Sequence, residues 1–255
     1  MTNYVIQISE AALMDMSVAA LEGYMAVKPG QKVRKELEAY GLLWGHEILL
    51  PDEDILYAVE KMTIDSLALR RSTSVIPSNG ISIIKDLLTS YWPQYSLLGD
   101  FHTHPCESLG EVTKKAGYEF SEVDRKGTLE MAAADPDFRV SLLMTIASLG
   151  RTVEKAPEYD GECIVWDFGN YRFWLTACIA GITAEGDEDD ADDEAVGDFF
   201  LYPNSSEWKV QYEPEDVDDV ILRCPYLLHP WAATEFGRRR GDNHVVPRMA
   251  RARRR

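Results

Sequence analysis

The sequence predicts a single β-sheet flanked by helices, in an α/β or α+β arrangement, over residues 1–182. Apolar runs of strand length recur along this stretch. Helical segments with recognisable caps stand between them, so that strands and helices follow one another rather than forming separate blocks. Elements in that order pack most simply as one sheet with helices against it, and a C-terminal extension follows.

The expected elements can be placed from apolar spacing and from turn residues. They are, in order, a strand over Tyr4–Ile8, a helix over Glu10–Ala26, strands over Gly41–Gly45, Ile55–Met62 and Leu67–Ile76, a helix over Ile81–Tyr91, a strand over Leu97–His104, a helix from Asp124 to Ala134, a strand over Val140–Ala147, and a hairpin of Cys163–Phe168 with Arg172–Ile179 turned at Gly169-Asn170.

Capping residues mark where the helices begin. Ser9 is a good N-cap for the first helix, either Asn79 or Ser78 can cap the second, and Ser121 is well placed to cap the third. The strand at Gly41–Gly45 is apolar with a glycine at each end, which indicates a buried strand whose backbone is closely approached.

Charge divides the rest of the chain. Residues 183–198 are an acidic run that predicts a solvated linker, and 199–236 form the C-terminal extension. Residues 237–255 contain eight arginines and one aspartate and so carry a charge of about +7. Because the net charge of the whole chain is −17, the other residues together carry about −24. We expect this tail to be disordered or to fold back on the acidic run. An acidic body excludes general nucleic-acid binding, except through the Arg-rich tail.

The composition is that of a soluble globular protein, with 45% hydrophobic and 27% charged residues. The sequence lacks a run long enough to span a bilayer and a signal peptide, so we expect a cytoplasmic location and no membrane partner. The four cysteines form no CxxC pair, which favours buried free thiols over disulfides or a cysteine zinc site.

Two histidines in one strand are the first sign of chemistry. His102 and His104 stand two apart before Pro105, so their side chains point to the same face and can reach one metal ion. Asp124 supplies a carboxylate suited to be the third ligand. Two nitrogens and one oxygen, with a fourth position open to water, are typical of a catalytic zinc site.

A metal that activates water needs a general base, and Glu38 is the candidate. Glu36 is the alternative base because it shares the same face of a strand. Three other side chains are weaker candidates: His46 is expected to be structural, Cys106 to be a passive neighbour of the metal, and Trp44 to be core. His229 and His244 are isolated in the C-terminal region and support no site.

Together these residues resemble a known motif. Glu38-x-x-Gly41-x-Leu43-x-Gly45, then His102-x-His104-Pro105, then Ser121-x-x-Asp124, is similar to the JAMM motif of the MPN (JAB) metalloprotease family. The resemblance covers roughly residues 4–180. It implies the MPN/JAB, cytidine-deaminase-like fold, in which a curved mixed sheet is flanked by helices.

The resemblance also implies roles for the motif residues. Zn2+ would be held by His102, His104 and Asp124, with Glu38 as general base and then acid. Ser121 would help to stabilise the oxyanion of the tetrahedral intermediate. Such enzymes cleave isopeptide or peptide bonds after the C-terminal tail of ubiquitin or ubiquitin-like proteins. The family includes bacterial deconjugases that work with E1- and E2-like operon partners, and the acidic run and Arg-rich tail favour such a specialised enzyme.

The sequence departs from the motif in one place. Fifteen residues separate Pro105 from Ser121, about twice the usual gap, and we interpret Cys106–Phe120 as an elongated loop beside the metal. Two other functions remain open: a non-catalytic MPN scaffold or binding module with a silent metal site, and a metal hydrolase that acts on another substrate.

Overall fold

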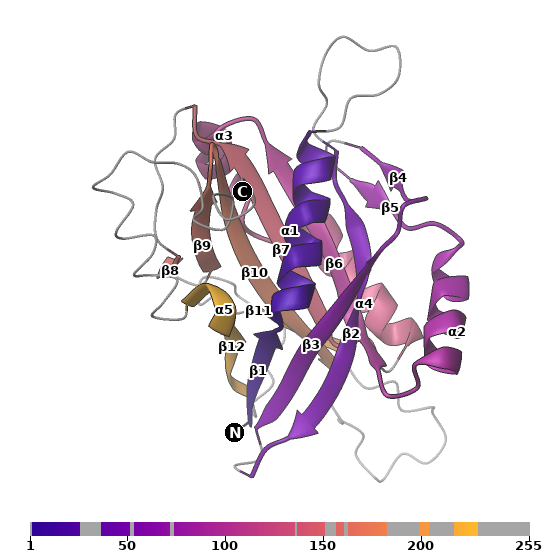
Figure 1. Ribbon diagram of the computed structural model, residues 1–255. Helices are drawn as coiled ribbons and strands as arrows, with labels where there is room; N and C mark the ends of the chain where they lie inside the picture. The colour runs from indigo at the N-terminus through magenta and orange to yellow at the C-terminus, as the bar shows by residue number, and fades with distance from the viewer. Residues whose placement is uncertain are drawn as a thin grey trace, which may run out of the picture.

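The protein is a mixed sheet with helices on both faces (Figure 1). The structure is a computed structural model that describes residues 2–25, 37–51, 54–71, 74–135, 137–150, 157–160, 163–182, 199–203 and 217–228. Its elements are β1 (Thr2–Ile8), α1 (Glu10–Tyr24), β2 (Tyr40–Leu49), β3 (Ile55–Ile64), β4 (Leu69–Arg70), β5 (Val75–Ile76), α2 (Ile81–Tyr91), β6 (Ser96–Cys106), α3 (Leu109–Lys115), α4 (Glu122–Ala134), β7 (Val140–Ser148), β8 (Glu158–Asp160), β9 (Cys163–Phe168), β10 (Tyr171–Ile182), β11 (Phe199–Pro203), β12 (Val217–Arg223) and α5 (Pro225–Leu228).

The main sheet places the histidine strand at its centre. The strand order is β12-β1-β3-β2-β6-β7-β10-β9-β8, and β11 pairs with the far part of β10. β6 runs antiparallel to β2 on one side and parallel to β7 on the other. Both backbone edges of β6 are therefore hydrogen-bonded, so the histidines stand on a rigid strand. Among the described residues, every helix is too short or too polar to cross a bilayer.

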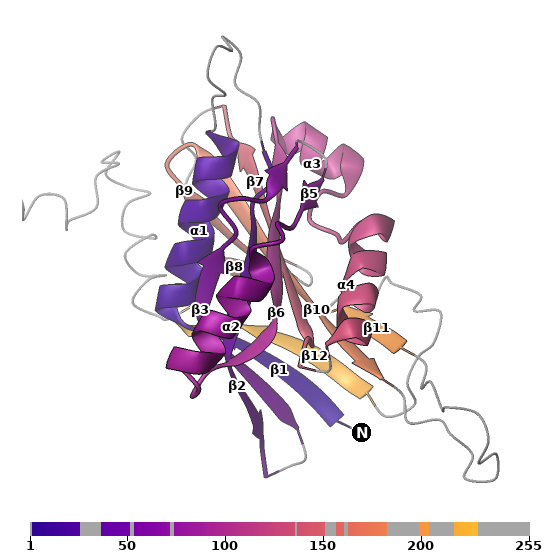
Figure 2. The same cartoon turned by 90° about the vertical axis from the view of Figure 1, so that its right-hand side faces the viewer.

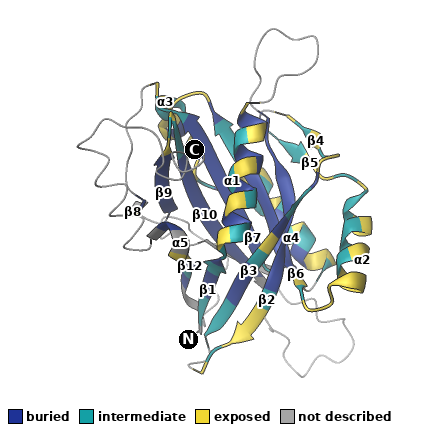
Figure 3. Ribbon diagram, viewed as in Figure 1, coloured by how far each residue is buried: buried dark blue, intermediate teal, exposed yellow. Residues whose placement is uncertain are grey.

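One face of the sheet is covered by α1. Its apolar side, which includes Leu13 and Met16, packs on residues such as Leu43, Phe101 and Leu142 in the largest core cluster. Ser9 caps this helix by accepting a hydrogen bond from the backbone N–H of Ala12, as predicted. Figure 3 shows the result as a buried central sheet beneath a helix whose outer side is exposed.

The opposite face is shared among smaller clusters. α2 packs on Leu42, Trp44 and Leu97. α4 lies over a cluster that includes Phe120 and Leu143. Figure 2 shows α1 and α4 on opposite sides of the sheet, with α3 at the same end as the β4–β5 hairpin. The motif residues lie on this divided face, where no single helix seals the sheet.

The glycines of β2 behave as predicted. A Cβ atom on Gly45 would lie 1.8 Å from the carbonyl oxygen of Ala58, and one on Gly41 would lie 2.6 Å from the carbonyl oxygen of Thr63. Both contacts are with the backbone of β3, so only glycine lets the two strands approach this closely. The hairpin turn at Gly169, with φ of 60°, and the four buried free cysteines are also confirmed.

Three local predictions are wrong. Leu67–Ile76 is not one strand but the short β4–β5 hairpin, in which the backbone N–H of Arg71 donates to the carbonyl of Ser74. Asp65 holds the two ends of the hairpin together by accepting hydrogen bonds from the backbone N–H groups of Leu67 and Ser78. The N-cap of α2 is Gly80, without a side-chain cap bond, rather than Asn79 or Ser78. The Cys106–Phe120 segment is not an elongated loop throughout, because β6 continues past Pro105 to Cys106 and the segment then contains α3.

The C-terminal extension contributes to the same sheet. β11 pairs with β10, and β12 adds a parallel strand beside β1. These segments therefore continue the architecture of residues 1–182 rather than forming a second unit. The predicted acidic linker at 183–198 and the Arg-rich tail at 237–255 lie outside the described residues.

Candidate metal centre

The two histidines of β6 project from the same face of the sheet. In the register of the sheet, Tyr40 of β2 lies opposite His102, and Thr145 of β7 lies beside His104. Gly99, three residues before His102, has φ of 153°, and a Cβ there would lie 1.7 Å from the carbonyl oxygen of Val140. The close approach of β6 to β7 at this glycine fixes the strand that carries the imidazoles.

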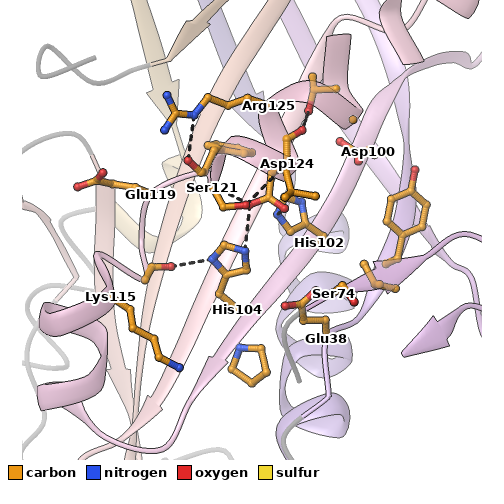
Figure 4. A pocket seen from close by; sticks show the side chains of 18 of the residues that line it. Glu38, Ser74, Asp100, His102, His104, Lys115, Glu119, Ser121, Asp124 and Arg125 are labelled. Atoms are coloured by element: carbon orange, nitrogen blue, oxygen red, sulfur yellow. Dashed lines mark hydrogen bonds and ion pairs between the residues drawn. The ribbon is translucent and has the colours of Figure 1, made fainter. Parts of the chain in front are cut away.

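Asp124 reaches the histidines from the first turn of α4. The backbone N–H of Ser121 donates to Asp124 Oδ2 at 2.7 Å, and Ser121 Oγ accepts from the backbone N–H of Asp124 at 3.2 Å, which together form a capping box. The same carboxylate faces His102 and His104 (Figure 4). The cap therefore fixes the rotamer of Asp124 as well as the start of the helix.

The spacing of the three side chains suits a metal ion better than direct hydrogen bonds. His102 Nε2 lies 3.6 Å from Asp124 Oδ1, and His104 Nε2 lies 3.3 Å from Asp124 Oδ2. Both distances are long for a hydrogen bond, and they resemble the spacing of about 3.3–3.6 Å between ligands that lie about 2.0–2.2 Å from one tetrahedral zinc ion, although they end on different oxygens of the carboxylate. One ligand atom from each residue lies within 4.8 Å of the others.

An unpaired nitrogen supports the same reading. His102 Nε2 is buried and has no hydrogen-bond partner. A buried polar atom without a partner is costly unless something binds it. Imidazole nitrogens with a carboxylate oxygen are a donor set that zinc accepts, so the residues present fit the ion that the sequence predicts.

Charges within the site are strongly coupled. Burial alone would raise the pKa of Asp124, but the imidazoles of His102 and His104 hold that pKa well below its usual range. Burial works against protonation of His102, yet the Asp124 carboxylate outweighs it and raises the pKa of the imidazole. The ionised Asp124 carboxylate thus favours a positive charge at the point where the three groups converge.

Glu38 is brought to the site by the residue between the histidines. Thr103 Oγ1 accepts a hydrogen bond from the backbone N–H of Ala39 at 2.8 Å, and the backbone N–H of Thr103 donates to the carbonyl of Ala39 at 3.1 Å. Continuing the β2–β6 register by two residues places Glu38 opposite His104, with both side chains on the same face. Its side chain is buried, and burial raises the pKa of Glu38 to about 7, although the charges of His104 and His102 oppose the shift.

All five motif residues line one cavity of about 690 Å³. Its walls come from β2, the β4–β5 hairpin, β6, the segment around α3, and α4 (Figure 4). Other residues that line the cavity include Asp100, Cys106, Gly117 and Phe120. The cavity size is in the range of small-molecule and peptide sites.

The remaining candidates have simpler environments. Cys106 lines the cavity, but burial raises the pKa of its thiol to about 11, which keeps it protonated near neutral pH. The ring of His46 lies 5.6 Å from that of Tyr95, and His46 does not belong to the metal-binding group found among the described residues. Trp44 is buried in the core, as predicted. Glu36, His229 and His244 lie outside the described residues.

Several supporting residues were not singled out from the sequence. Thr103 anchors Glu38, and the ring of Phe120 packs edge-on against His102 at 5.7 Å. Asp100 accepts a 2.5 Å hydrogen bond from Ser141 in the next strand. The alternation of β6 could have indicated that Thr103 points away from the histidines, but its partner on another segment has no sequence signal.

Comparisons with known proteins add no family. No family model matches the chain, and no curated protein matches it. Among solved structures, the N-terminal domain of STIL from Trichoplax adhaerens aligns with a TM-score of 0.34 and 12% identity, over 70% of this chain and 43% of that chain. The aligned part is thus less than half of that structure. A likeness at this level carries no argument about fold or function.

Proposed function

We propose that this protein is a zinc-dependent peptidase or isopeptidase of the JAMM type, with the MPN/JAB fold, that cleaves after the C-terminal tail of a ubiquitin-like protein. The observation that carries the proposal is the convergence of His102, His104 and Asp124 in one cavity with the buried Glu38 opposite His104. Ligands and base come from three separate elements, which makes a chance cluster of surface acids a poor explanation.

The residues have distinct tasks in this proposal. A zinc ion held by the three ligands would act as a Lewis acid on the scissile carbonyl and lower the pKa of water. Glu38 accepts a proton from the attacking water and returns it to the leaving nitrogen. A carboxylate with a pKa near neutrality suits both tasks, since it can take up and release the proton at cellular pH.

Ser121 is suited to steady the oxyanion. Its Oγ uses a lone pair to accept from the backbone N–H of Asp124, and that bond leaves the hydroxyl hydrogen to be donated. The side chain lines the cavity next to the Asp124 carboxylate. It is also fixed by the capping box, so it needs no reorganisation when charge develops.

The substrate class rests on the resemblance to the JAMM family and on the cavity. A volume of about 690 Å³ accommodates a short extended segment rather than a folded domain. The β4–β5 hairpin forms one wall, and α4 with the end of the α3 segment forms another, so a chain terminus can enter between them. A ubiquitin-like protein with an extended tail fits this shape.

The test combines metal analysis with cleavage assays. The purified protein should contain about one zinc per chain and should cleave linear and isopeptide-linked ubiquitin-like fusions. Glu38→Gln should lower the rate by about 10²- to 10⁴-fold with zinc retained. Glu22→Gln, on the exposed side of α1 across the sheet from the cavity, is the matched control and should leave the rate unchanged.

Other outcomes would redirect the assignment. Asp124→Ala should lose zinc and activity together. A protein without zinc whose function survives a chelator would be a scaffold. Zinc-dependent hydrolysis that ignores ubiquitin-like conjugates would indicate another substrate. Full cleavage by Glu38→Gln would refute the proposed mechanism.

A further inference from the structure

The inserted segment between Pro105 and Ser121 contacts a candidate metal ligand directly. His104 Nδ1 lies 2.9 Å from the carbonyl oxygen of Gly117, which directly follows α3 and its C-cap, Ala116. A carbonyl oxygen can only accept a hydrogen bond, so Nδ1 must carry the proton. In the neutral imidazole, His104 Nε2 then keeps its lone pair, and this is the nitrogen that faces Asp124.

The same carbonyl also binds the neighbouring strand. Thr145 Oγ1 donates to the carbonyl oxygen of Gly117 at 2.6 Å, and Thr145 is the register partner of His104 on β7. Thr145 is fully buried. Both lone pairs of the Gly117 oxygen are therefore used, one by the imidazole and one by the threonine, which fixes where the oxygen stands.

The backbone around Gly117 is held by α3 and by the sheet. The N–H of Gly117 donates to the carbonyl of Val112 at 2.9 Å, which closes the end of the helix after Ala116 in the left-handed conformation. The next carbonyl, that of Tyr118, accepts from Thr176 of β10 at 2.8 Å. The carbonyl that orients His104 thus depends on how α3 is docked.

Val112 is the residue that docks α3. It is 2% exposed and packs in a cluster with Cys106, Val165 and Trp174. Its neighbours Thr113 and Lys114 are exposed. Gly117 also sits close to the sheet, since a Cβ there would lie 3.1 Å from Cys106 Sγ. A bulkier residue at this position would push the carbonyl away from His104.

We propose that the Gly117 carbonyl is a positioning group for His104, so that the docked α3 segment sets the metal affinity of the site. This inference rests on the proposed metal centre. Hydrogen bonds to the second nitrogen of a ligating histidine fix its tautomer and ring orientation, and their loss typically lowers metal affinity by about 10- to 100-fold. The insertion would then be part of the metal centre and not only a wall of the substrate site.

A purely structural role makes a different prediction. If the Gly117 carbonyl serves only to end α3, loosening the helix should lower thermal stability without changing His104. If it positions His104, the same change should alter the tautomer balance of the imidazole and weaken metal binding. The two roles are therefore separated by measurements made on His104 itself.

The first experiment compares Val112→Ala with Lys114→Ala in the full chain. The imidazole ¹⁵N shifts of the metal-free proteins report which nitrogen of His104 carries the proton, and zinc affinity is measured by competition with a chromophoric chelator. We expect Nδ1 of His104 to carry a proton in the unsubstituted protein. Val112→Ala should mix the tautomers and weaken zinc binding by about 10-fold or more, whereas Lys114→Ala should match the unsubstituted protein.

A second pair of variants, at Thr145, tests the same inference if Val112→Ala does not fold. Thr145→Val removes one donor from the Gly117 carbonyl and keeps the side-chain shape, whereas Thr145→Ser keeps the donor. Zinc affinity should fall in the first variant and be restored in the second. An Nε2–H tautomer in the unsubstituted protein, or zinc affinity unchanged in both Val112→Ala and Thr145→Val, would overturn the inference. Failure of the unsubstituted protein to bind zinc would instead overturn the proposed function, while the tautomer measurement would still judge the role of Gly117.

Discussion

The substitution Thr103→Val tests how Glu38 is held in place without changing His102 or His104, the candidate metal ligands on either side of Thr103 in the sequence. Thr103 is 1% exposed and Ala39 is 0% exposed, and the threonine hydroxyl accepts the backbone N–H of Ala39. Valine has nearly the same shape but no acceptor, so that N–H would be left buried without a partner. The backbone bond from the N–H of Thr103 to the carbonyl of Ala39 does not involve the side chain and should persist.

The expected cost follows from that one unpaired donor. A buried N–H without a partner costs about 1–3 kcal/mol. For a domain of this size, each kcal/mol lowers Tm by about 2–4 °C, so a loss of about 2 kcal/mol corresponds to about 4–8 °C. The segment that carries Glu38 should also shift, which should reduce cleavage more than it reduces zinc binding. Urea denaturation, differential scanning calorimetry, a cleavage assay and zinc titration measure the free energy of unfolding, Tm, the cleavage rate and zinc binding in turn.

Thr103→Ser is the matched control because it keeps the acceptor and loses only a methyl group. It should retain most of the cleavage rate. If Thr103→Val is as stable and as active as the unsubstituted protein, the Thr103–Ala39 bond does not position Glu38 and the reasoning fails. Equal losses in the valine and serine variants would instead point to packing of the methyl group.

Three further results are expected. Chelation of zinc present at 100 times its dissociation constant should remove about 2.7 kcal/mol, a fall in Tm of about 5–11 °C by calorimetry. Asp167→Asn should lower the free energy of unfolding in urea by about 3–5 kcal/mol, because it breaks the buried two-bond pair with Arg172 (2.7 and 2.9 Å). Burial raises the pKa of Cys224 from 9.0 to about 12. The unfolded chain alone should release that proton between these values, so stability should fall as pH rises from about 9 to 12, and less steeply in Cys224→Ala.

Local signals explain what the sequence could predict. The strand of His102 and His104 follows from apolar spacing, but the prediction that Pro105 ends it is wrong, because β6 continues to Cys106. Ser121 and Asp124 are three residues apart at the start of α4, and that spacing is the signature of the capping box that the structure contains. In both cases the interactions that decide the structure lie within one element, so the local sequence is enough to predict them.

Two features could not be predicted from local signals, because they depend on contacts between distant segments. They are the docking of the inserted segment on the sheet and the register between β2 and β6. Ser108 caps α3 by accepting from the backbone N–H of Glu111, a local signal that the gap length obscured. The bond from His104 to Gly117 depends instead on how that helix docks on the sheet. Likewise, Glu38 faces His104 because β2 pairs with β6 in one register, and a shift of one residue would turn its side chain to the other face.

The burial pattern itself argues that this face of the sheet serves a function. Glu38, Asp100, His102 and Ser141 are buried polar residues on this face, on or beside three adjacent strands. Asp100 and Ser141 are compensated by the hydrogen bond between them, but His102 Nε2 has no hydrogen-bond partner. Burying such groups lowers stability, and an apolar core at the same place would avoid the cost. Buried polar groups without a partner break the usual rule for a protein core, and such exceptions are found mainly at functional sites. A bound cation would satisfy Nε2 of His102 and offset the negative charge of Asp124.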